Sequence, residues 1–309
     1  MKPSVGSDWQ RLPSTMRGER VVHLPDDWNV WTFSDPHGVA TGLEAALLEA
    51  GLVDAALSWI APAGTALVGC GDYLDRGRDS RRVLALLRRV QREAEATGSR
   101  AVFTRGNHEE MVLHLSIGRH EWLPLWLAYG GHATLQSFGC APDDPAQDER
   151  ALLRVEEEAP GLFAWLASMP QAVKWRDVLF VHGGLPAGAG LDELGITTDR
   201  HLWVRAEFFE TPWESGAFER FVAAGVERVV FGHTPGPDGV RVMQGGRLLA
   251  ADSNACGNPK LPPDARRMVT LVEMGDDSFD RARLVVVPTD DAPDRALNPD
   301  PADAMLEYR

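Results

Sequence analysis

Short polar clusters built from Asp, His, Asn and Arg stand directly after five apolar runs of this sequence. The clusters are SDPHG, GDYLDRG, RGNHEE, HGG and GHTP. Their candidate metal ligands are Asp35, His37, Asp72, Asn107, His182 and His233. Carboxylate, amide and imidazole groups bind divalent ions, and a carboxylate can bridge two ions through its two oxygens. The set offers enough oxygen and nitrogen donors for two neighbouring ions that share Asp72.

Taken singly, each of these residues has an ordinary structural explanation. Asp35 and His37 lie two residues apart, so both side chains can point the same way at a strand end, but such pairs also arise by chance. Asn107 in a Gly-Asn-His turn can form an Asx-turn or cap a helix. A lone histidine after a strand is more often structural than a ligand. The joint occurrence of all six favours a metal centre over separate structural roles.

The cluster GDYLDRG gathers two carboxylates and a guanidinium at the end of a buried run, where burying a charge is costly. A salt bridge on the surface is one explanation, and a metal site is the other. Arg76 favours the second, because a planar guanidinium suits bidentate binding of phosphate oxygens. Two-metal centres orient and activate a water for attack on a phosphoryl group. The ligands and Arg76 together predict hydrolysis of a phosphate ester.

The elements that must position these residues are short strands alternating with longer helical patterns, which is typical of α/β proteins. Strands are expected at NVWTF, TALVGC, RAVFT, DVLFV and VERVVF. The spacing of apolar residues predicts helices over residues 42–60 and 80–98. In open α/β sheets, ligands bind beyond the carboxyl ends of the strands. We therefore expect the five polar clusters to meet in one place.

The chain is expected to divide into an arm, a domain and a tail. Residues 1–27 contain much Pro, Gly and charge and are expected to form a partly ordered arm. Residues 28–290 form the expected domain, in which the Trp- and Leu-rich residues 111–170 are an inserted helical cap. One more strand, RARLVVV, precedes an Asp- and Pro-rich tail over residues 291–309 that we expect to be flexible.

The composition argues against several classes of protein. The 309 residues carry a formal net charge of −14, which disfavours duplex nucleic acid and anionic membrane surfaces as partners. No apolar stretch approaches the roughly 20 residues that cross a bilayer, and the polar N-terminus lacks the apolar region of a secretory signal. The three cysteines form no CxxC pair, which fits a reducing cytoplasm. We expect a cytoplasmic protein in which local arginines and metals attract an anionic substrate.

The ordered series of clusters resembles the motifs of the calcineurin-like metallophosphoesterases, specifically the PPP-type serine/threonine phosphatases. WLAYGGHATLQSFG, HLWVRAEFFE and VVFGHTP are similar to segments of the bacterial members and of the related symmetrical diadenosine tetraphosphatases. The resemblance extends from Trp28 to Cys256. It implies an α/β fold, with a central β-sandwich of two mixed sheets flanked by helices and the helical cap over the site.

The resemblance also implies a role for each residue of these motifs. The ligands of the first metal would be Asp35, His37 and Asp72. The ligands of the second would be Asp72, Asn107, His182 and His233. His108 would be the general acid that protonates the leaving oxygen, oriented by Asp75. Arg76 and Arg205 would bind the phosphate oxygens. Two divalent ions are implied as cofactors, with Mn²⁺ expected for activity in vitro and Fe or Zn as alternatives.

The implied reaction is hydrolysis of a phosphomonoester, with phosphoserine or phosphothreonine on proteins as the expected substrate. The alternative is hydrolysis of a dinucleoside polyphosphate, such as diadenosine tetraphosphate, or of another nucleotide phosphoanhydride. A nucleotide enzyme needs an aromatic or arginine platform for the base, for which Trp122, Trp126 and Tyr129 are the candidates. A catalytically silent scaffold on the same fold is a third reading, but no ligand and no acid is missing.

Departures from the family pattern concern three places. Ser34 stands where the family has glycine before the first aspartate. The segment ADSNACG differs from the family's DTG-type turn, so Asp252 is not assigned to the site. Residues 257–275 do not match the family pattern, which leaves the rim of the substrate site near the C-terminus undefined.

Overall fold

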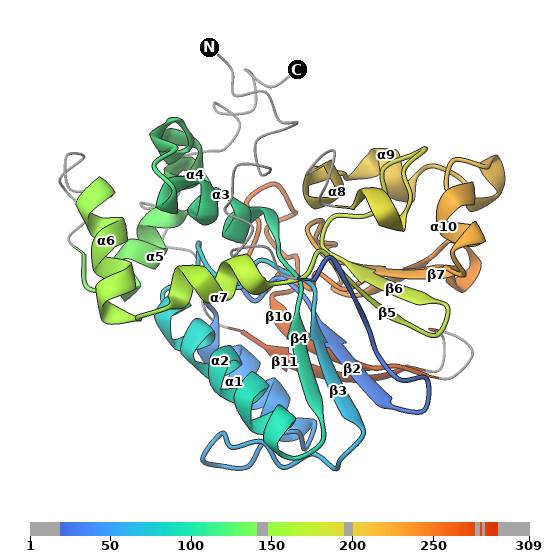
Figure 1. Cartoon of the computed structure of the whole chain (residues 1–309), viewed down its shortest axis with the longest axis horizontal. Coiled ribbons are helices and arrows are strands. Elements are labelled where there is room, and N and C mark those ends of the chain that lie inside the picture. The colour runs from blue at the N-terminus through green and yellow to red at the C-terminus, as the bar shows by residue number, and fades with distance from the viewer. Residues whose placement is uncertain (1–18, 141–147, 195–199, 276–278, 280–281, 290–309) are drawn as a thin grey trace.

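Two β-sheets lie face to face at the centre of the molecule, with helices on their outer faces (Figure 1). The computed structural model describes residues 19–140, 148–194, 200–275, 279 and 282–289. One sheet has, in spatial order, β1 (Val21–His23), β5 (Ala172–Trp175), β6 (Val178–Val181), β7 (Arg228–Phe231), β9 (Leu248–Ala250) and β8 (Arg241–Met243). The other has β11 (Arg283–Pro288), β10 (Met268–Glu273), β2 (Asn29–Phe33), β3 (Thr65–Gly69) and β4 (Arg100–Phe103).

Both sheets mix parallel and antiparallel pairs. Strands β2, β3 and β4 are parallel, while β10 runs antiparallel to β2 and to β11. In the six-stranded sheet, β6, β7 and β9 are parallel, and β5 and β8 are antiparallel to β6 and β9. The predicted sandwich of two mixed sheets flanked by helices is confirmed. The strands that precede the polar clusters, β2, β3, β4, β6 and β7, run parallel within their sheets. The clusters of each sheet therefore lie at the same edge, beyond the carboxyl ends of these strands.

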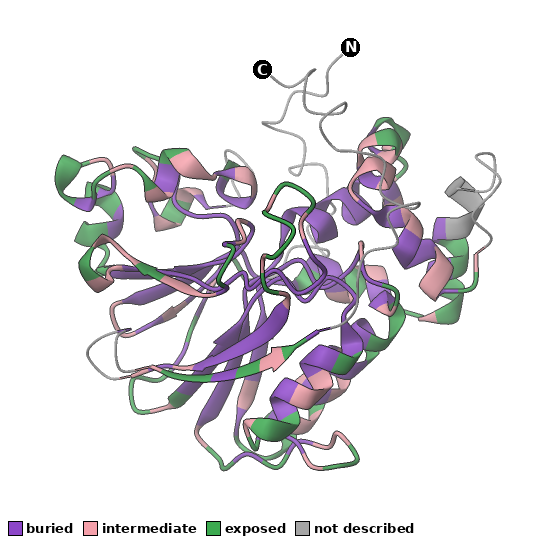
Figure 2. Ribbon diagram, turned by 180° about the vertical axis from the view of Figure 1, so that it is seen from behind, coloured by how far each residue is buried: buried purple, intermediate pink, exposed green. Residues whose placement is uncertain are grey.

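The space between the sheets is filled by apolar side chains from both of them. These include Val30, Val68, Val102, Phe180 and Val230. The strands concerned are buried along almost their whole length, as the purple ribbons of Figure 2 show. A strand covered on both faces is an unbroken apolar run rather than an alternating one, which is why TALVG and RVVF are recognisable in the sequence.

Helices α1 (Ala40–Glu49) and α2 (Ser80–Ala96) cover the outer face of the five-stranded sheet. The apolar stripe of α2 is buried as its spacing predicts, so the helix expected over residues 80–98 is confirmed. The helix expected over residues 42–60 is wrong beyond Glu49. Gly51 adopts a left-handed conformation with φ of 75°, which ends α1, and Val53 then pairs with Trp59 in an isolated β-bridge.

A group of helices between β4 and β5, here called the helical segment, packs beside α2 (Figure 1). Its members are α3 (Asn107–Ser116), α4 (Leu123–Ala128), α5 (Gly131–Ser137), α6 (Asp148–Glu158) and α7 (Leu162–Ser168). Trp122 and Trp126 belong to the same apolar core as α1 and α2. The outer face of the six-stranded sheet is covered by α9 (Ala206–Phe209) and α10 (Glu219–Ala223), and α8 (Arg200–Trp203) precedes α9 in the chain.

The structure differs from the sequence expectations at the N-terminus. The expected arm over residues 1–27 is wrong for Val21–His23, which form β1 and pair in parallel with β5. A three-residue strand is too short to show a periodic pattern, and its partner lies far away in the chain. Residues 1–18 and the expected flexible tail over residues 291–309 lie outside the described residues.

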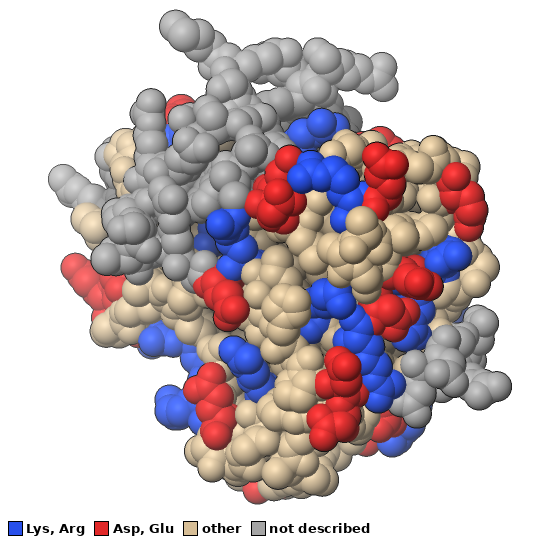
Figure 3. Space-filling view, turned by 45° about the vertical axis from the view of Figure 1, so that its right-hand side comes forward, with Lys and Arg blue, Asp and Glu red and all other residues tan. Residues whose placement is uncertain are grey.

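The surface carries both signs of charge despite the net charge of −14. On the face drawn in Figure 3, acidic and basic side chains are interspersed. Among the described residues, no helix combines the length and the apolar character that a membrane span requires.

Candidate metal centre and catalytic site

The carboxyl ends of β2, β3, β4, β6 and β7 bring all six candidate metal ligands together, and Asp72 lies at their centre. Oδ1 of Asp72 is 3.3 Å from Nε2 of His182, and its Oδ2 is 3.5 Å from Nε2 of His37. Oδ1 of Asn107 is 2.9 Å from Nε2 of His182. The two oxygens of one carboxylate therefore face two different histidines, which come from different sheets.

Two groups of possible ligand atoms share Asp72. In each group the atoms lie within 4.8 Å of one another; the groups are His37, Asp72 and His108, and Asp72, His182 and His233. Asp35 extends the first group, since its Oδ1 is 3.9 Å from Nε2 of His37. The side chains are almost fully buried, so the donors are held in fixed positions.

The orientation of the histidine rings fits a role as metal ligands. Nδ1 of His37 donates to the carbonyl of Leu74 at 2.9 Å, and Nδ1 of His182 donates to the carbonyl of Cys70 at 2.8 Å. With each ring anchored through Nδ1, Nε2 points into the cluster, where the neutral form of the ring offers its lone pair to an ion. Nε2 of His233 is buried and has no hydrogen-bond partner among the described residues. The residues present therefore fit a pair of divalent ions.

The backbone around the cluster is held in a rarely populated conformation. Six of the expected site residues have positive φ: Asp35, His37, Asp72, Asp75, Arg76 and His233. For residues other than glycine this costs about 1–3 kcal/mol each and persists only where the surroundings enforce it. Gly106 allows the close approach of two loops, because a Cβ there would lie 2.2 Å from Oδ1 of Asp72. This accumulation of strain makes the strand ends the candidate functional site.

Glu109 fixes these loops and was not singled out by the sequence. Its Oε2 accepts hydrogen bonds from the backbone N–H groups of Asp72 and Gly106, both at 2.9 Å. Its Oε1 accepts from the N–H of Tyr73 at 2.8 Å. Burial and the neighbouring charge of Asp72 raise the pKa of Glu109 to about 7. One buried side chain thus ties the turn that carries Asn107 to the loop that carries the bridging carboxylate.

The electrostatics of the cluster are those of a site suited to cations. Burial, together with the charges of Asp252 and Asp72, raises the pKa of Asp35 well above its usual value. Burial opposes ionisation of Asp72 too, but the nearby His182 and His108 lower its pKa well below the usual value. Burial and the Arg76 cation lower the pKa of His37 to about 3, so its imidazole is neutral at pH 7. Bound cations would favour the ionised form of both carboxylates.

Two guanidinium groups, from different segments of the chain, lie against the cluster. Nη1 of Arg76 is 2.9 Å from Nε2 of His37, and its Nη2 is 3.1 Å from Nε2 of His108. Nη1 of Arg205 donates to the carbonyl of His233 at 2.7 Å. Burial and the nearby charge of Arg76 lower the pKa of Arg205. These two guanidinium groups supply positive charge beside the cluster, which suits an anionic substrate.

His108 and Asp75 form a close pair next to the two groups. Nδ1 of His108 is 2.7 Å from Oδ2 of Asp75, and both side chains are fully buried. The backbone N–H of His108 donates to Oδ1 of Asp72 at 3.1 Å. Burial lowers the pKa of His108 well below its usual value; Arg76 acts in the same direction and Asp72 opposes it.

The aromatic residues expected as a platform for a base occupy different places. Trp122 and Trp126 are buried in the apolar core and cannot stack on a ligand, so neither candidate serves as a platform. Tyr129 is half-buried, and its ring centroid lies 5.9 Å from that of His108. The ring of Trp203, not singled out in the sequence, lies 6.0 Å from Tyr129 and 6.2 Å from His233. These two rings form an aromatic pair beside the cluster.

The places where the sequence departs from the family pattern are accommodated by packing. Ser34 takes part in a parallel bridge with Asp252, and its hydroxyl donates to the carbonyl of Cys70 at 3.2 Å. Asp252 is buried and its charge contributes to the raised pKa of Asp35, so it belongs to the surroundings of the site. Residues 257–275 contain β10, which pairs with β2 and β11.

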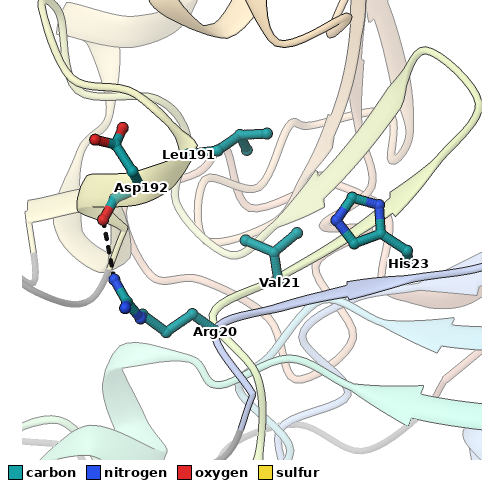
Figure 4. A pocket seen from close by; sticks show the side chains of 5 residues that line it. All are labelled: Arg20, Val21, His23, Leu191 and Asp192. Carbon is teal, nitrogen blue, oxygen red and sulfur yellow. Dashed lines mark hydrogen bonds between the residues drawn. The ribbon is translucent and has the colours of Figure 1, made fainter.

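An open depression of about 500 Å³ lies elsewhere, at the edge strand β1 (Figure 4). It is lined by Arg20, Val21, His23, Leu191 and Asp192. The Arg20 guanidinium donates to the carbonyl of Asp192 at 3.0 Å. None of these residues belongs to the candidate ligand set, and we assign no role to the depression.

The chain belongs to the calcineurin-like phosphoesterase family, which matches residues 29–251. It is a hydrolase of the phosphatase type. Serine/threonine-protein phosphatase 1 of Salmonella typhimurium is 27% identical over 223 residues, which cover 71% of this chain and 86% of that protein. Shewanella-like protein phosphatase 2 of Arabidopsis thaliana is 38% identical over 77 residues, 25% of this chain and only 19% of that protein.

A solved structure has the same fold at low sequence identity. The cold-active protein-tyrosine phosphatase of a psychrophilic Shewanella superposes with a TM-score of 0.59 at 18% identity, covering 92% of this chain and 91% of that chain. Both the family match and the fold agree with the resemblance expected from the polar clusters.

Proposed function

We propose that the protein is a phosphatase with a two-metal centre in which Asp72 bridges the ions. The observation that carries the proposal is the placement of its carboxylate, with Oδ1 toward His182 and Oδ2 toward His37. The remaining ligands would be Asp35 for the first ion and Asn107 and His233 for the second. The mixed oxygen and nitrogen donors suit Mn²⁺, our choice for activity in vitro, with Fe or Zn as alternatives.

The side chains around the centre have separate tasks in the proposed reaction. When bound, the two ions would activate a water and offset the charge of the transferred phosphoryl group. Arg76 and Arg205 bind the phosphate oxygens through their guanidinium groups. His108 donates a proton from Nε2 to the leaving oxygen, while Asp75 accepts the Nδ1–H of the same ring. Burial and the Arg76 cation lower the pKa of His108, and a phosphate dianion next to Arg76 would oppose the contribution of that cation.

The proposed substrates are phosphoserine and phosphothreonine side chains of proteins. Their leaving groups are alkoxides, which need the proton that His108 supplies. The name of the Salmonella relative supports this substrate class. The chain has three cysteines and no CxxC pair, which fits the cytoplasmic location that we propose from the cysteine content.

A second candidate function is hydrolysis of a dinucleoside polyphosphate. Tyr129 and Trp203 favour it, because an aromatic pair next to His108 could stack on a base carried by the leaving group. The same pair could also contact a peptide side chain or a phosphotyrosine ring. The cluster itself is common to all these reactions, so only a comparison of substrates distinguishes them.

The test is a substrate panel with the purified protein in Mn²⁺, using phosphoserine, phosphothreonine and phosphotyrosine peptides and diadenosine tetraphosphate. We expect kcat/KM for the phosphoserine and phosphothreonine peptides to exceed that for the dinucleotide at least roughly tenfold. A chelator should abolish every activity, and added Mn²⁺ should restore it. Much faster cleavage of diadenosine tetraphosphate would overturn the protein-phosphatase assignment but would not contradict the proposed metal centre. Dominant phosphotyrosine cleavage would change the substrate class in the same way.

A further inference from the structure

Two side chains of the helical segment hold the carboxylate of Asp75. The indole Nε1–H of Trp126, in α4, donates to Oδ2 at 2.9 Å, the same oxygen that lies 2.7 Å from Nδ1 of His108. The hydroxyl of Thr134, in α5, donates to Oδ1 at 2.6 Å. All four side chains are buried, so water does not compete for these bonds.

The chemistry of these groups fixes the direction of each bond. An indole N–H can only donate, so Oδ2 of Asp75 must accept from Trp126. The backbone N–H of Asp75 donates to Oγ1 of Thr134 at 2.9 Å, which directs the hydroxyl proton of Thr134 toward an acceptor. Ser80 Oγ, at 3.1 Å, is a more distant acceptor than Oδ1 of Asp75. Asp75 therefore accepts on both oxygens. Burial raises the pKa of Asp75 well above its usual value, and the hydrogen bonds from Thr134 and Trp126 oppose that rise. These two bonds thus favour a carboxylate that accepts the Nδ1–H of His108.

The turn between α4 and α5 also fits against the neighbouring arginine. The backbone N–H of Arg76 donates to the carbonyl of Gly130 at 3.1 Å. Gly130 has φ of 101°, and a Cβ there would lie 2.8 Å from the backbone nitrogen of Arg76. Helices α4 and α5 with their turn thus contact Asp75 through Trp126 and Thr134, and Arg76 through Gly130.

We propose that Trp126 and Thr134 are positioning residues of the phosphatase reaction. By holding Asp75 as an acceptor they fix the ring of His108 with Nδ1–H toward Asp75 and Nε2 toward the substrate. The helical segment therefore completes the proton-donating pair rather than only covering the site. This inference rests on the proposed role of His108 as the proton donor.

The test compares two substrates that differ in how much their leaving group needs a proton. An alkyl phosphate, such as a phosphoserine peptide, needs general-acid help, whereas p-nitrophenyl phosphate has a good leaving group and needs little. Trp126→Phe removes the N–H and keeps most of the ring volume, and Thr134→Val removes the hydroxyl with little change of shape. We expect each to lower kcat on the phosphopeptide roughly tenfold, with less than about a twofold change on p-nitrophenyl phosphate and in KM.

Matched variants separate positioning from packing. Trp122→Phe makes the same substitution in the same core, at an indole N–H that has no hydrogen-bond partner among the described residues. It should leave both activities unchanged. Thr134→Ser keeps the hydroxyl and should retain the rate that Thr134→Val loses. Metal content, measured on every variant, should stay at the wild-type level.

Equal losses on the two substrates, loss of metal, or no loss in either variant would overturn the inference. His108→Asn, measured on the same two substrates, distinguishes this failure from a failure of the proposed function. If His108→Asn shows the larger loss on the alkyl phosphate and Trp126→Phe does not, only the positioning role is wrong. If His108→Asn itself shows no such difference, the assignment of the proton donor is wrong.

Discussion

Replacing Asp72 with asparagine is expected to abolish both metal binding and turnover. The carboxylate is 1% exposed, and its two oxygens face His182 and His37, which belong to separate ligand groups. Asparagine keeps the shape of the side chain but has one oxygen and one NH₂ group. It therefore cannot coordinate two cations through two oxygens. Its lost negative charge would also leave two divalent ions less well neutralised. Metal analysis of the purified variant and its hydrolysis of p-nitrophenyl phosphate measure the two effects.

Asp79→Asn provides the matched control for this variant. Asp79 lies in the same loop, directly before α2, and has no assigned ligand role. The control should keep wild-type metal content and turnover, so that a loss in Asp72→Asn reports the site and not the removal of any acidic group. Unchanged hydrolysis in Asp72→Asn would disprove the bridging role and with it the two-metal mechanism.

His108→Asn is expected to retain the metals and to lose rate roughly 10²- to 10⁴-fold on a phosphoserine peptide. The metals should stay because the backbone N–H of His108, which the substitution leaves in place, donates to Oδ1 of the bridging Asp72. The rate should fall because asparagine cannot transfer a proton to the leaving oxygen. Steady-state kinetics together with metal analysis separates the two properties.

The result that would contradict this role is a parallel loss of metal and rate. Nε2 of His108 lies 3.8 Å from Oδ2 of Asp72, and the ring belongs geometrically to the group that contains His37. Loss of metal in His108→Asn would therefore indicate that His108 is a metal ligand. The leaving oxygen would then lack its proposed proton donor.

The convergence of the polar clusters could be predicted from the sequence because the strands before them are unmistakable. NVWTF is a short apolar run that coincides with β2, and DVLFV is another that contains β6. Both runs are followed directly by polar residues. Parallel strands then place those residues at one edge. The resemblance to a known family added the division of labour among the ligands, the acid and the arginines, which spacing alone does not contain.

The supporting residues could not be predicted because their partners are distant in the chain. Trp126 and Asp75 are 51 residues apart, and an indole in a Trp- and Leu-rich stretch has the pattern of an ordinary core residue. Glu109 adjoins the motif, but its role depends on backbone N–H groups of a loop that only the fold brings near. The edge strand β1 and the short strand β8 have three residues each, too few for a periodic signal.

The central claim is that turnover needs two ions held around Asp72, and a metal titration tests it most directly. Metal-free protein is titrated with Mn²⁺, and bound ions and phosphopeptide hydrolysis are measured in the same samples. We predict about two bound ions per chain, with turnover appearing as the second ion binds. Full turnover in the metal-free protein, or at about one bound ion with no further binding, would contradict the account.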